Sequence, residues 1–429
     1  MKGFLSDDMR QGAFVGKVPW MTFLFLTAIF FIGQHDWFFS LNAGEGFGLM
    51  LDESTARVDQ GNILRQIVFS CMGVYAVVSL VWTRYRFKVE GVLGLLVLLF
   101  LSWAILSLAW SEDPAISFRR LVLLMMLWLC SLVVSQRFSL HEFVLWVFLS
   151  TLIYSHIGLA AELILGTFHP LTGGYRFAGT LHPNSQGINC ALLFFASFFL
   201  LIDQKRLRWV FIAIACESLI FLFLTKSRTS LAFSLLALPI YWFIKGPLPR
   251  KGALVLCVLF ISSILLLIGD YIMPFFQHSI TLGRKNAETS TLTGRIPLWG
   301  ELLPYIARRP IVGYGYDGFW TSTHIAEIAR GQNWVVTQGH SAYLDLSLGL
   351  GVVGAVVYIL MLLVGIRRTI TFHKDSGNTD YAFLGVVLIF IALNGLLESI
   401  IIIANQVSFI TLMILTGLGF SSKPRARIG

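Results

Sequence analysis

The sequence is poor in charged residues. Of its 429 residues only 13% are Asp, Glu, Lys or Arg, whereas 56% are hydrophobic. The mean hydropathy is +0.76. A soluble domain carries about 25% charged residues, so this chain has too few charges to cover a soluble globule. The same figures exclude a disordered chain and a nucleic-acid-binding protein, and no nucleic-acid partner is expected.

Cysteine is also scarce. The five cysteines all lie inside apolar runs, so the sequence shows neither a disulfide framework nor a metal-binding spacing. The N-terminus lacks the features of a signal peptide, since Met1 to Lys17 carries two aspartates and no small-x-small cleavage site follows the next apolar run. That run therefore predicts a first membrane helix. The cysteines are Cys71, Cys130, Cys190, Cys216 and Cys257.

Several catalytic motifs are missing. Neither a P-loop nor a dinucleotide-binding fingerprint is present, so a cytoplasmic nucleotide is not expected as the energy source. No carboxylate pair of the glycosidase type stands out. The polar motifs described below lack Asp-x-Asp, His-x-x-x-His and Cys-x-x-Cys, so we expect neither a metal nor another cofactor. The chain also lacks the internal repeats of many transporters.

Long apolar stretches dominate what is present. About 12 membrane helices of roughly 20 residues would use about 240 residues. The sequence therefore predicts an all-α polytopic membrane protein with a membrane region at 18–273, a long polar segment at 274–340 (the long loop) and a second membrane region at 341–420. The expected spans are 18–33, 63–82, 91–110, 119–135, 142–165, 186–202, 208–224, 229–244, 252–273, 341–366, 381–397 and 400–420.

Lysine and arginine are denser in every second connection between the expected spans. Because such residues concentrate in cytoplasmic loops, this pattern places both termini in the cytoplasm. The remaining cations fall on the outer side. Lys226 and Arg228 stand at the N-terminal end of the 229–244 span, where the helix dipole disfavours a cation, so an anion should compensate them. It could be a ligand, because ionisable residues in a membrane usually mark a site. It could also be one of the acids in the outer halves of the spans, namely Glu162, Glu217, Asp270, Asp345 and Glu398.

The long loop contains a short helix and a group of aromatic residues. Pro297 to Ala307 predicts an amphipathic helix, with proline near its first turn. Tyr314, Tyr316 and Trp320 follow in a glycine-rich stretch. These rings form either an interfacial belt or a stacking surface for sugars.

Four polar motifs lie on the predicted outer side. Arginine forks match phosphate oxygens bidentately, so several arginines without a carboxylate pair suit a diphosphate leaving group. The Pro-Asn pair of the first motif has a structural alternative, since Asn184 or Ser185 could cap the helix that follows. The motifs are Tyr175 to Asn184, Lys226 to Thr229, Thr293 to Arg295, and Gln338 to Leu344.

In this order the motifs resemble those of the O-antigen ligase and polymerase superfamily of bacterial inner-membrane proteins. The resemblance covers roughly residues 170–360. Within the superfamily, the stretches around Arg295 and Tyr314 look most like the exopolysaccharide polymerase branch associated with succinoglycan-type polymers. The matching residues are Arg176, Gly179, His182, Pro183, Asn184, Ser227, Arg228, Thr229, Thr293, Gly294, Arg295, Trp299, Pro310, Gly313, Gly315, His340, Tyr343, Leu344 and Gly351.

The resemblance implies a metal-independent membrane glycosyltransferase with a large periplasmic loop over a lipid-accessible cavity. It would take a glycan from undecaprenyl diphosphate. In a polymerase of exopolysaccharide biosynthesis the acceptor is another lipid-linked repeat unit; in a ligase of lipopolysaccharide assembly it is the lipid A core. Other polysaccharide assembly proteins are possible partners.

The resemblance also implies residue roles. Arg176, Arg228 and Arg295 would hold the diphosphate, and His340 would deprotonate the acceptor hydroxyl, with His324 as a rival. The expected catalytic residues are His340, Arg295 and Arg176, and the expected substrate-binding residues are Arg228, Lys226, His182, Asn184, Tyr343, Tyr314, Tyr316 and Trp320.

Two other functions remain open. The acids within the membrane spans would suit a transporter, although the long loop and the one-sided arginines oppose it. A scaffold subunit would not need the guanidinium groups. Convergence of Arg176, Arg228, Arg295 and His340 would indicate a transferase, whereas scattering along a path would indicate a transporter.

Overall fold

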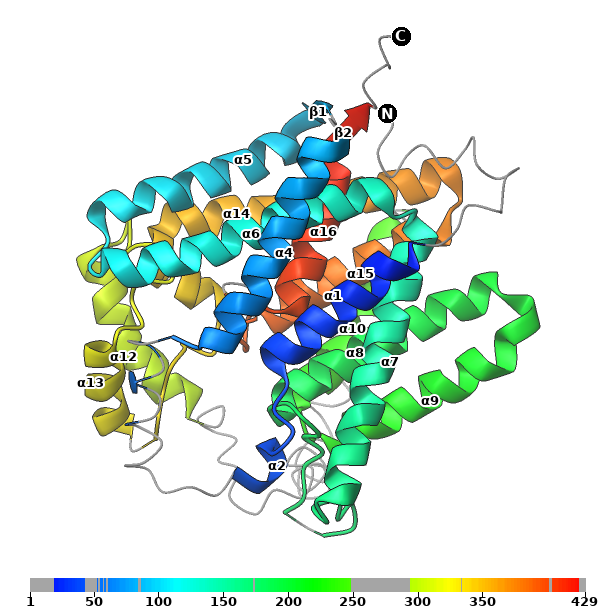
Figure 1. The fold of residues 1–429 in the computed structure, drawn as a ribbon, viewed down its shortest axis with the longest axis horizontal. Helices are drawn as coiled ribbons and strands as arrows, with labels where there is room; N and C mark the ends of the chain where they lie inside the picture. Colours follow the sequence, from blue (N-terminus) through cyan, green and yellow to red (C-terminus); the bar gives the residue numbers. More distant parts are fainter. Residues whose placement is uncertain are drawn as a thin grey trace, which may run out of the picture.

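The computed structural model describes residues 19–42, 52, 55, 56, 58, 61–83, 86–172, 174–247, 294–332, 334–400 and 403–423. This part of the chain is almost entirely helical, with one pair of short strands (Figure 1). The fold class predicted from the sequence, an all-α polytopic membrane protein, is confirmed. The expected span 252–273 and the first part of the long loop, 274–293, lie outside the described residues.

Most of the described helices begin and end within a few residues of the expected spans, but α14 continues to Ser376 instead of ending at 366, and α16 begins at Gln406 instead of 400. Among the described residues six helices are long and apolar enough to cross a membrane, namely α4, α5 with its 3-10 extension, α6, α7, α8 and α14. Three shorter helices, α1, α15 and α16, are also apolar. The elements are α1 (Trp20–Gln34), α2 (Phe39–Asn42), α4 (Ile63–Thr83), β1 (Arg86–Val89), α5 (Gly91–Leu106), η2 (Ser107–Trp110), α6 (Pro114–Arg137), α7 (Leu140–Ile164), α8 (Pro183–Asp203), η3 (Lys205–Leu207), α9 (Arg208–Leu224), α10 (Arg228–Lys245), α12 (Arg295–Arg308), α13 (Ser322–Gln332), α14 (Ala342–Ser376), α15 (Thr379–Asn394), α16 (Gln406–Gly419) and β2 (Phe420–Lys423).

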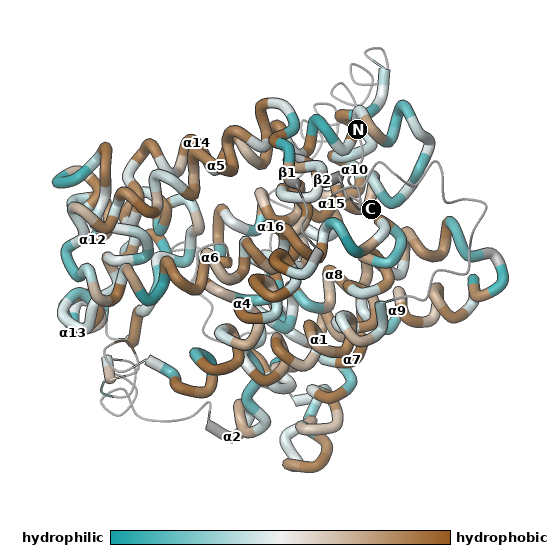
Figure 2. The backbone as a smooth tube through the Cα atoms, turned by 45° about the horizontal axis from the view of Figure 1, so that its top comes forward, coloured by the Kyte–Doolittle hydropathy of each residue, from teal (hydrophilic) through white to brown (hydrophobic). Residues whose placement is uncertain are grey.

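The outer surface of the helices is hydrophobic. Met21, Val81 and Trp82 are 83%, 72% and 85% exposed, and hydrophobic residues run along α5, α6 and α14 (Figure 2). In water such a surface would be unfavourable, because exposed apolar area carries a free-energy cost. In a bilayer it faces the acyl chains, as expected of a membrane protein.

The last helix lies among the earlier ones. α16 packs against α5, α6 and α14, and β2 pairs antiparallel with β1, with Val89 opposite Phe420. A Cβ on Gly94 would come within 2.3 Å of the Gly419 carbonyl oxygen. Glycine therefore permits the close approach of α5 and the end of α16.

Two of the glycine motifs have a structural explanation. Helix α14 is kinked at Gly351, which has a φ of 67°. A Cβ there would lie 2.0 Å from the Ile311 carbonyl oxygen, and one on Gly313 would lie 2.6 Å from the Gly349 carbonyl oxygen. The long loop thus packs backbone to backbone on the kink, and these glycines are needed for that contact rather than for chemistry.

Gly351→Ala is expected to destabilise the protein strongly. A non-glycine residue at positive φ costs about 1–3 kcal/mol, and the Cβ would also overlap the Ile311 carbonyl. The melting temperature of the detergent-purified protein measures the effect. Gly300→Ala is the matched control, because a Cβ at Gly300 would meet nothing within 4 Å. An unchanged melting temperature for Gly351→Ala would contradict the packing described here.

Candidate active site

The loop between α7 and α8 is held by a buried carboxylate near the end of α7. Glu162 is 1% exposed. Its Oε1 accepts hydrogen bonds from the backbone N–H groups of Ala178 (2.9 Å) and Gly179 (2.7 Å), and the Tyr175 hydroxyl donates to Oε2. Among its described contacts, this acid binds the loop backbone instead of pairing with an arginine, so it fixes the segment that carries the first polar motif.

Helix α8 begins with a cap that the sequence did not predict. Nδ1 of His182, at the N-cap, accepts a hydrogen bond from the Asn184 N–H (3.2 Å). The expected cap by Asn184 or Ser185 is therefore wrong, and the Asn184 amide is available for other contacts. Its Oδ1 accepts from Nη2 of Arg176 (2.7 Å), and its Nδ2 donates to Oε1 of Glu398 (2.9 Å).

Glu398 joins the four polar motifs. It lies between α15 and α16 and is 4% exposed. Besides Asn184, its Oε1 accepts from Thr229 Oγ1 (3.3 Å) and from Arg295 Nη2 (2.6 Å). Its Oε2 lies 3.9 Å from Nδ1 of His340. From the sequence, Glu398 was expected only as one of the acids that could compensate the outer cations. Its position inside an apolar stretch was the signal that could have marked it as a site residue.

Three arginines converge near this carboxylate. Arg176 donates from Nε to the Thr225 carbonyl (3.0 Å), just before α10. Arg228 is the first residue of α10, and its positive charge and that of Arg295 repel each other. The four residues thus bring together three guanidinium groups and one carboxylate. Such a cluster has an excess of positive charge and favours an anionic ligand.

The structure separates the two candidate histidines. His340 has a φ of 48°, its Nδ1 is buried without a hydrogen-bond partner among the described residues, and its ring lies 5.5 Å from that of Trp334. In contrast, Nδ1 of His324 lies 2.8 Å from the Phe319 carbonyl oxygen, and the ring stacks on Phe319 at 4.5 Å. A carboxylate lies beside each ring, since Nε2 of His324 is 3.7 Å from Oε1 of Glu112. The two differ in position: His340 lies on the cavity wall beside Glu398, while His324 is packed in the α12–α13 region.

A cavity of about 1330 Å³ lies beside this cluster. Its wall includes His182, Asn184, His340 and Glu398, together with apolar residues of α1, α4, α6, α14 and α16. Arg176, Arg228 and Arg295 are not wall residues; Arg176 contacts Asn184, and Arg295 contacts Glu398. Instead, three arginines that were not predicted as site residues contribute to the wall, namely Arg65, Arg119 and Arg120.

The aromatic residues of the long loop are buried. Tyr314, Tyr316 and Trp320 are only 5%, 3% and 3% exposed. Tyr314 and Trp320 pack with Leu298 of α12 in a small hydrophobic core, and Trp320 Nε1 donates to Asp345 Oδ1 (2.9 Å). These rings therefore form neither an exposed stacking surface nor an interfacial belt, although Tyr316 and Trp320 reach the cavity wall.

Two further predicted residues lie away from the cavity wall. The Tyr343 hydroxyl donates to the Ala392 carbonyl (2.7 Å) and joins α14 to α15. Lys226 has a φ of 49° in the turn before α10, where its N–H bonds the Phe223 carbonyl (3.0 Å). The geometry thus gives both residues a structural explanation.

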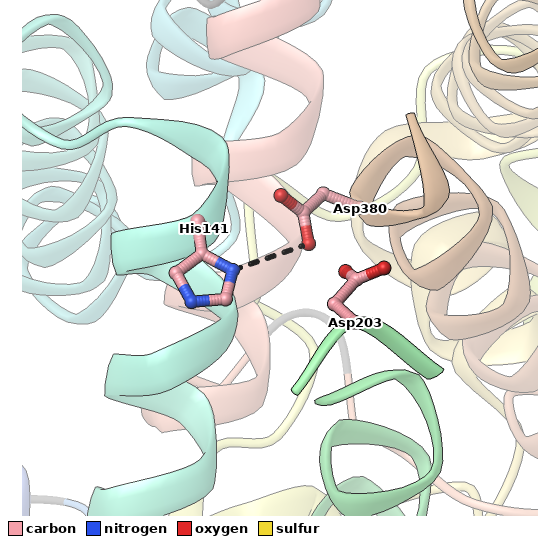
Figure 3. A group of neighbouring side chains, drawn as sticks. All are labelled: His141, Asp203 and Asp380. Carbon is pink, nitrogen blue, oxygen red and sulfur yellow. Dashed lines mark ion pairs between the residues drawn. The ribbon is translucent and has the colours of Figure 1, made fainter. Parts of the chain in front are cut away.

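One group of side chains in the described part of the chain could hold a metal ion. It consists of His141, Asp203 and Asp380, and Nδ1 of His141 lies 3.8 Å from Oδ1 of Asp380 (Figure 3). These residues lie at the start of α7, the end of α8 and the start of α15. Helix α8 alone is about 30 Å long at about 1.5 Å per residue, and its other end carries His182. A metal here could not reach the cluster around Glu398.

The fold and the site define a polytopic membrane protein with a cation-rich polar cluster beside a large, partly apolar cavity. A family model described as O-Antigen ligase matches residues 210–359. The matched segment includes α9, α10, the described part of the long loop and the first half of α14. Residues 210–359 are therefore similar to the O-antigen ligase family, which supports the superfamily that the motifs indicated. The match does not address the succinoglycan-type branch, and no curated protein matches the chain.

The matched family indicates the general kind of activity. Its members are glycosyltransferase-like ligases and polymerases that act on lipid-linked glycans. The match thus supports a membrane enzyme of this general kind.

Proposed function

We propose that this protein polymerises undecaprenyl-diphosphate-linked oligosaccharide repeat units at the periplasmic face of a bacterial inner membrane, with both termini in the cytoplasm. The observation that supports the proposal is the convergence of all four polar motifs on Glu398, next to a large cavity. A transporter would distribute such residues along a path across the membrane.

In this proposal the arginines bind the diphosphate of the donor. Negative charge develops on the leaving diphosphate as its bond to the sugar C1 breaks, and fixed positive groups stabilise that charge. Arg176 and Arg295 are held by Asn184 and Glu398, so their guanidinium groups are already oriented. Arg228, at the start of α10, adds a third positive charge.

His340 is the proposed general base. It accepts the proton of the acceptor hydroxyl, whose oxygen forms the new bond to C1 as the diphosphate leaves. Glu398, 3.9 Å from Nδ1, orients the ring and stabilises the imidazolium that results. The chemistry therefore needs only groups that this chain supplies.

A ligase that transfers the glycan to a lipid A core is the alternative, in keeping with the description of the matching family model. The glycan profile of a deletion strain distinguishes the two functions. Loss of polymer while single repeat units persist supports the polymerase. Polymer that accumulates on its lipid carrier would show a ligase instead.

Replacing Arg176 and Arg295 together by lysine is expected to abolish most of the polymer. Lysine keeps the positive charge but loses the planar fork that matches phosphate oxygens. The measurement is the polymer yield of a complemented deletion strain at equal protein level. Arg137→Lys is the control, since Arg137 is the last residue of α6 and donates to the Tyr75 hydroxyl, away from the Glu398 cluster. Near-normal polymer from the double variant would exclude the arginine site.

Glycan transfer by the purified protein is expected to continue in excess EDTA, because the proposed chemistry relies on arginines rather than on a metal. The His141→Ala variant is assayed in parallel. A rate that falls with EDTA in both proteins and returns with Mg²⁺ or Mn²⁺ would contradict metal independence. If EDTA lowers the rate of the wild type but not that of His141→Ala, the effect comes from a metal bound at His141, Asp203 and Asp380 and not from the active site.

A further inference from the structure

A second set of arginines faces the same cavity from α4 and α6. Nε of Arg120 lies 3.3 Å from Oδ2 of Asp317. Arg65 donates to the Ala404 carbonyl, while its Nε is buried without a hydrogen-bond partner among the described residues. Arg119 donates to the Val58 carbonyl (2.7 Å). In this part of the wall three guanidinium groups face one carboxylate.

The charge of Asp317 only partly offsets these arginines. Burial raises the pKa of Asp317 to about 6, against the opposing effect of the Arg120 guanidinium. The other acids of the wall are occupied elsewhere. Glu398 pairs with Arg295, and Oδ1 of Asp36 accepts from the Phe38 N–H (2.9 Å). The Asp345 carboxylate accepts from the Trp320 indole, the Gly339 N–H and the Ser399 hydroxyl. The part of the wall around Arg65 therefore keeps an excess of positive charge.

A chain of hydrogen bonds connects this set with the cluster around Glu398. Arg120 donates to the Trp320 carbonyl (3.3 Å), and Trp320 Nε1 donates to Asp345 Oδ1 (2.9 Å). The same carboxylate accepts from the Gly339 N–H (2.9 Å) and from the Ser399 hydroxyl. Gly339 precedes His340 and Ser399 follows Glu398, so the proposed base lies between the two arginine sets.

The cavity wall beside the second set is apolar. Ile32 of α1, Leu64 of α4, and Leu123, Met126 and Leu127 of α6 all contribute to it. A ligand that fits this part of the cavity therefore combines an anionic head group, bound by guanidinium forks, with a hydrocarbon chain.

We propose that Arg65, Arg119 and Arg120 bind the diphosphate of a second lipid-linked glycan, the acceptor. This inference rests on the proposed polymerase function, in which donor and acceptor are both lipid diphosphates. The donor loses its diphosphate at the Arg176–Arg228–Arg295 set. The acceptor keeps its own, because only its sugar hydroxyl reacts, and it therefore needs a separate site for its head group.

The test counts lipids bound to the purified full-length protein by native mass spectrometry, with undecaprenyl diphosphate as the probe. The wild type should bind two. Arg65→Gln with Arg119→Gln should bind one, as should Arg176→Gln with Arg295→Gln, and the fourfold variant none. Arg137→Gln, a matched change on the opposite end of α6, should still bind two. Arg65→Lys with Arg119→Lys preserves charge and folding, and should weaken binding of the second lipid at least tenfold.

The possible failures are distinguishable. A wild type that binds one lipid, lost only in the Arg176–Arg295 variant, would overturn the acceptor site and leave the donor site standing. No binding at all would contradict the proposed function itself. Purified lipid A core, added as a competitor, gives the last outcome: if it displaces the lipid that depends on Arg65 and Arg119, the acceptor is lipid A and the proposal is wrong.

Discussion

Glu398→Ala is expected to abolish glycan transfer and to destabilise the protein. The substitution removes the acceptor shared by Asn184, Thr229 and Arg295, and the carboxylate beside His340. Removing one partner of a buried ion pair costs about 3–5 kcal/mol, and the Arg295–Glu398 pair is largely buried, with side chains 14% and 6% exposed. Thermal unfolding of the purified variant and its rate per folded molecule measure the two effects.

Glu398→Gln separates positioning from folding. Glutamine keeps the shape and an oxygen acceptor for Asn184, Thr229 and Arg295 but removes the charge, so the variant should be less destabilised than Glu398→Ala and should still bind donor. Its kcat should fall by about 10²-fold or more, the low end of the contribution of a positioned base. Glu217→Gln is the control, since that acid pairs with His156 (3.2 Å) in a partly exposed position on α9. A folded Glu398→Gln enzyme with an ordinary kcat would refute the role of the carboxylate.

His340→Ala is expected to lower the transfer rate by about 10²–10⁴-fold while folding and donor binding persist. The reason is that a sugar hydroxyl is a weak nucleophile until a base removes its proton. His324→Ala should behave in the opposite way: loss of its stacking on Phe319 and of its hydrogen bond should lower stability, while the folded fraction keeps its rate.

Single-turnover assays with purified lipid-linked donor measure both variants, with the folded fraction determined by gel filtration. A folded His340→Ala variant that retains more than about a tenth of the wild-type rate would exclude His340 as the base.

The membrane helices could be predicted from the sequence because the bilayer fixes their length and composition. Helix α12 could be predicted as well, and the structure gives Arg295–Arg308 where the pattern gave 297–307. Both predictions depend on local signals. The same is true of Arg295 at the start of α12 and of Arg176 in the loop before α8.

The role of Glu398 could not be predicted, because it depends on contacts with Asn184 and Arg295, which are 214 and 103 positions away along the chain. Arg65 could not be predicted as a wall residue for the same reason, because its neighbour Asp317 lies far along the chain, in the long loop. Composition also cannot tell an exposed aromatic ring from a buried one, so Trp320 was taken for a sugar-stacking residue. Its indole instead satisfies Asp345.

The position of α16 has a consequence for how the chain is made. This helix is synthesised after α5, α6 and α14, yet it packs against all three (Figure 1). Its Gln406 also donates to the Ser150 hydroxyl of α7 (2.8 Å), and its N–H bonds Oε1 of Gln34 of α1 (3.2 Å). Until α16 has been synthesised, the earlier helices therefore lack a neighbour that packs between them and bonds Ser150 and Gln34. Chains truncated before residue 406 should therefore fail to pack their earlier helices and should be degraded by membrane proteases.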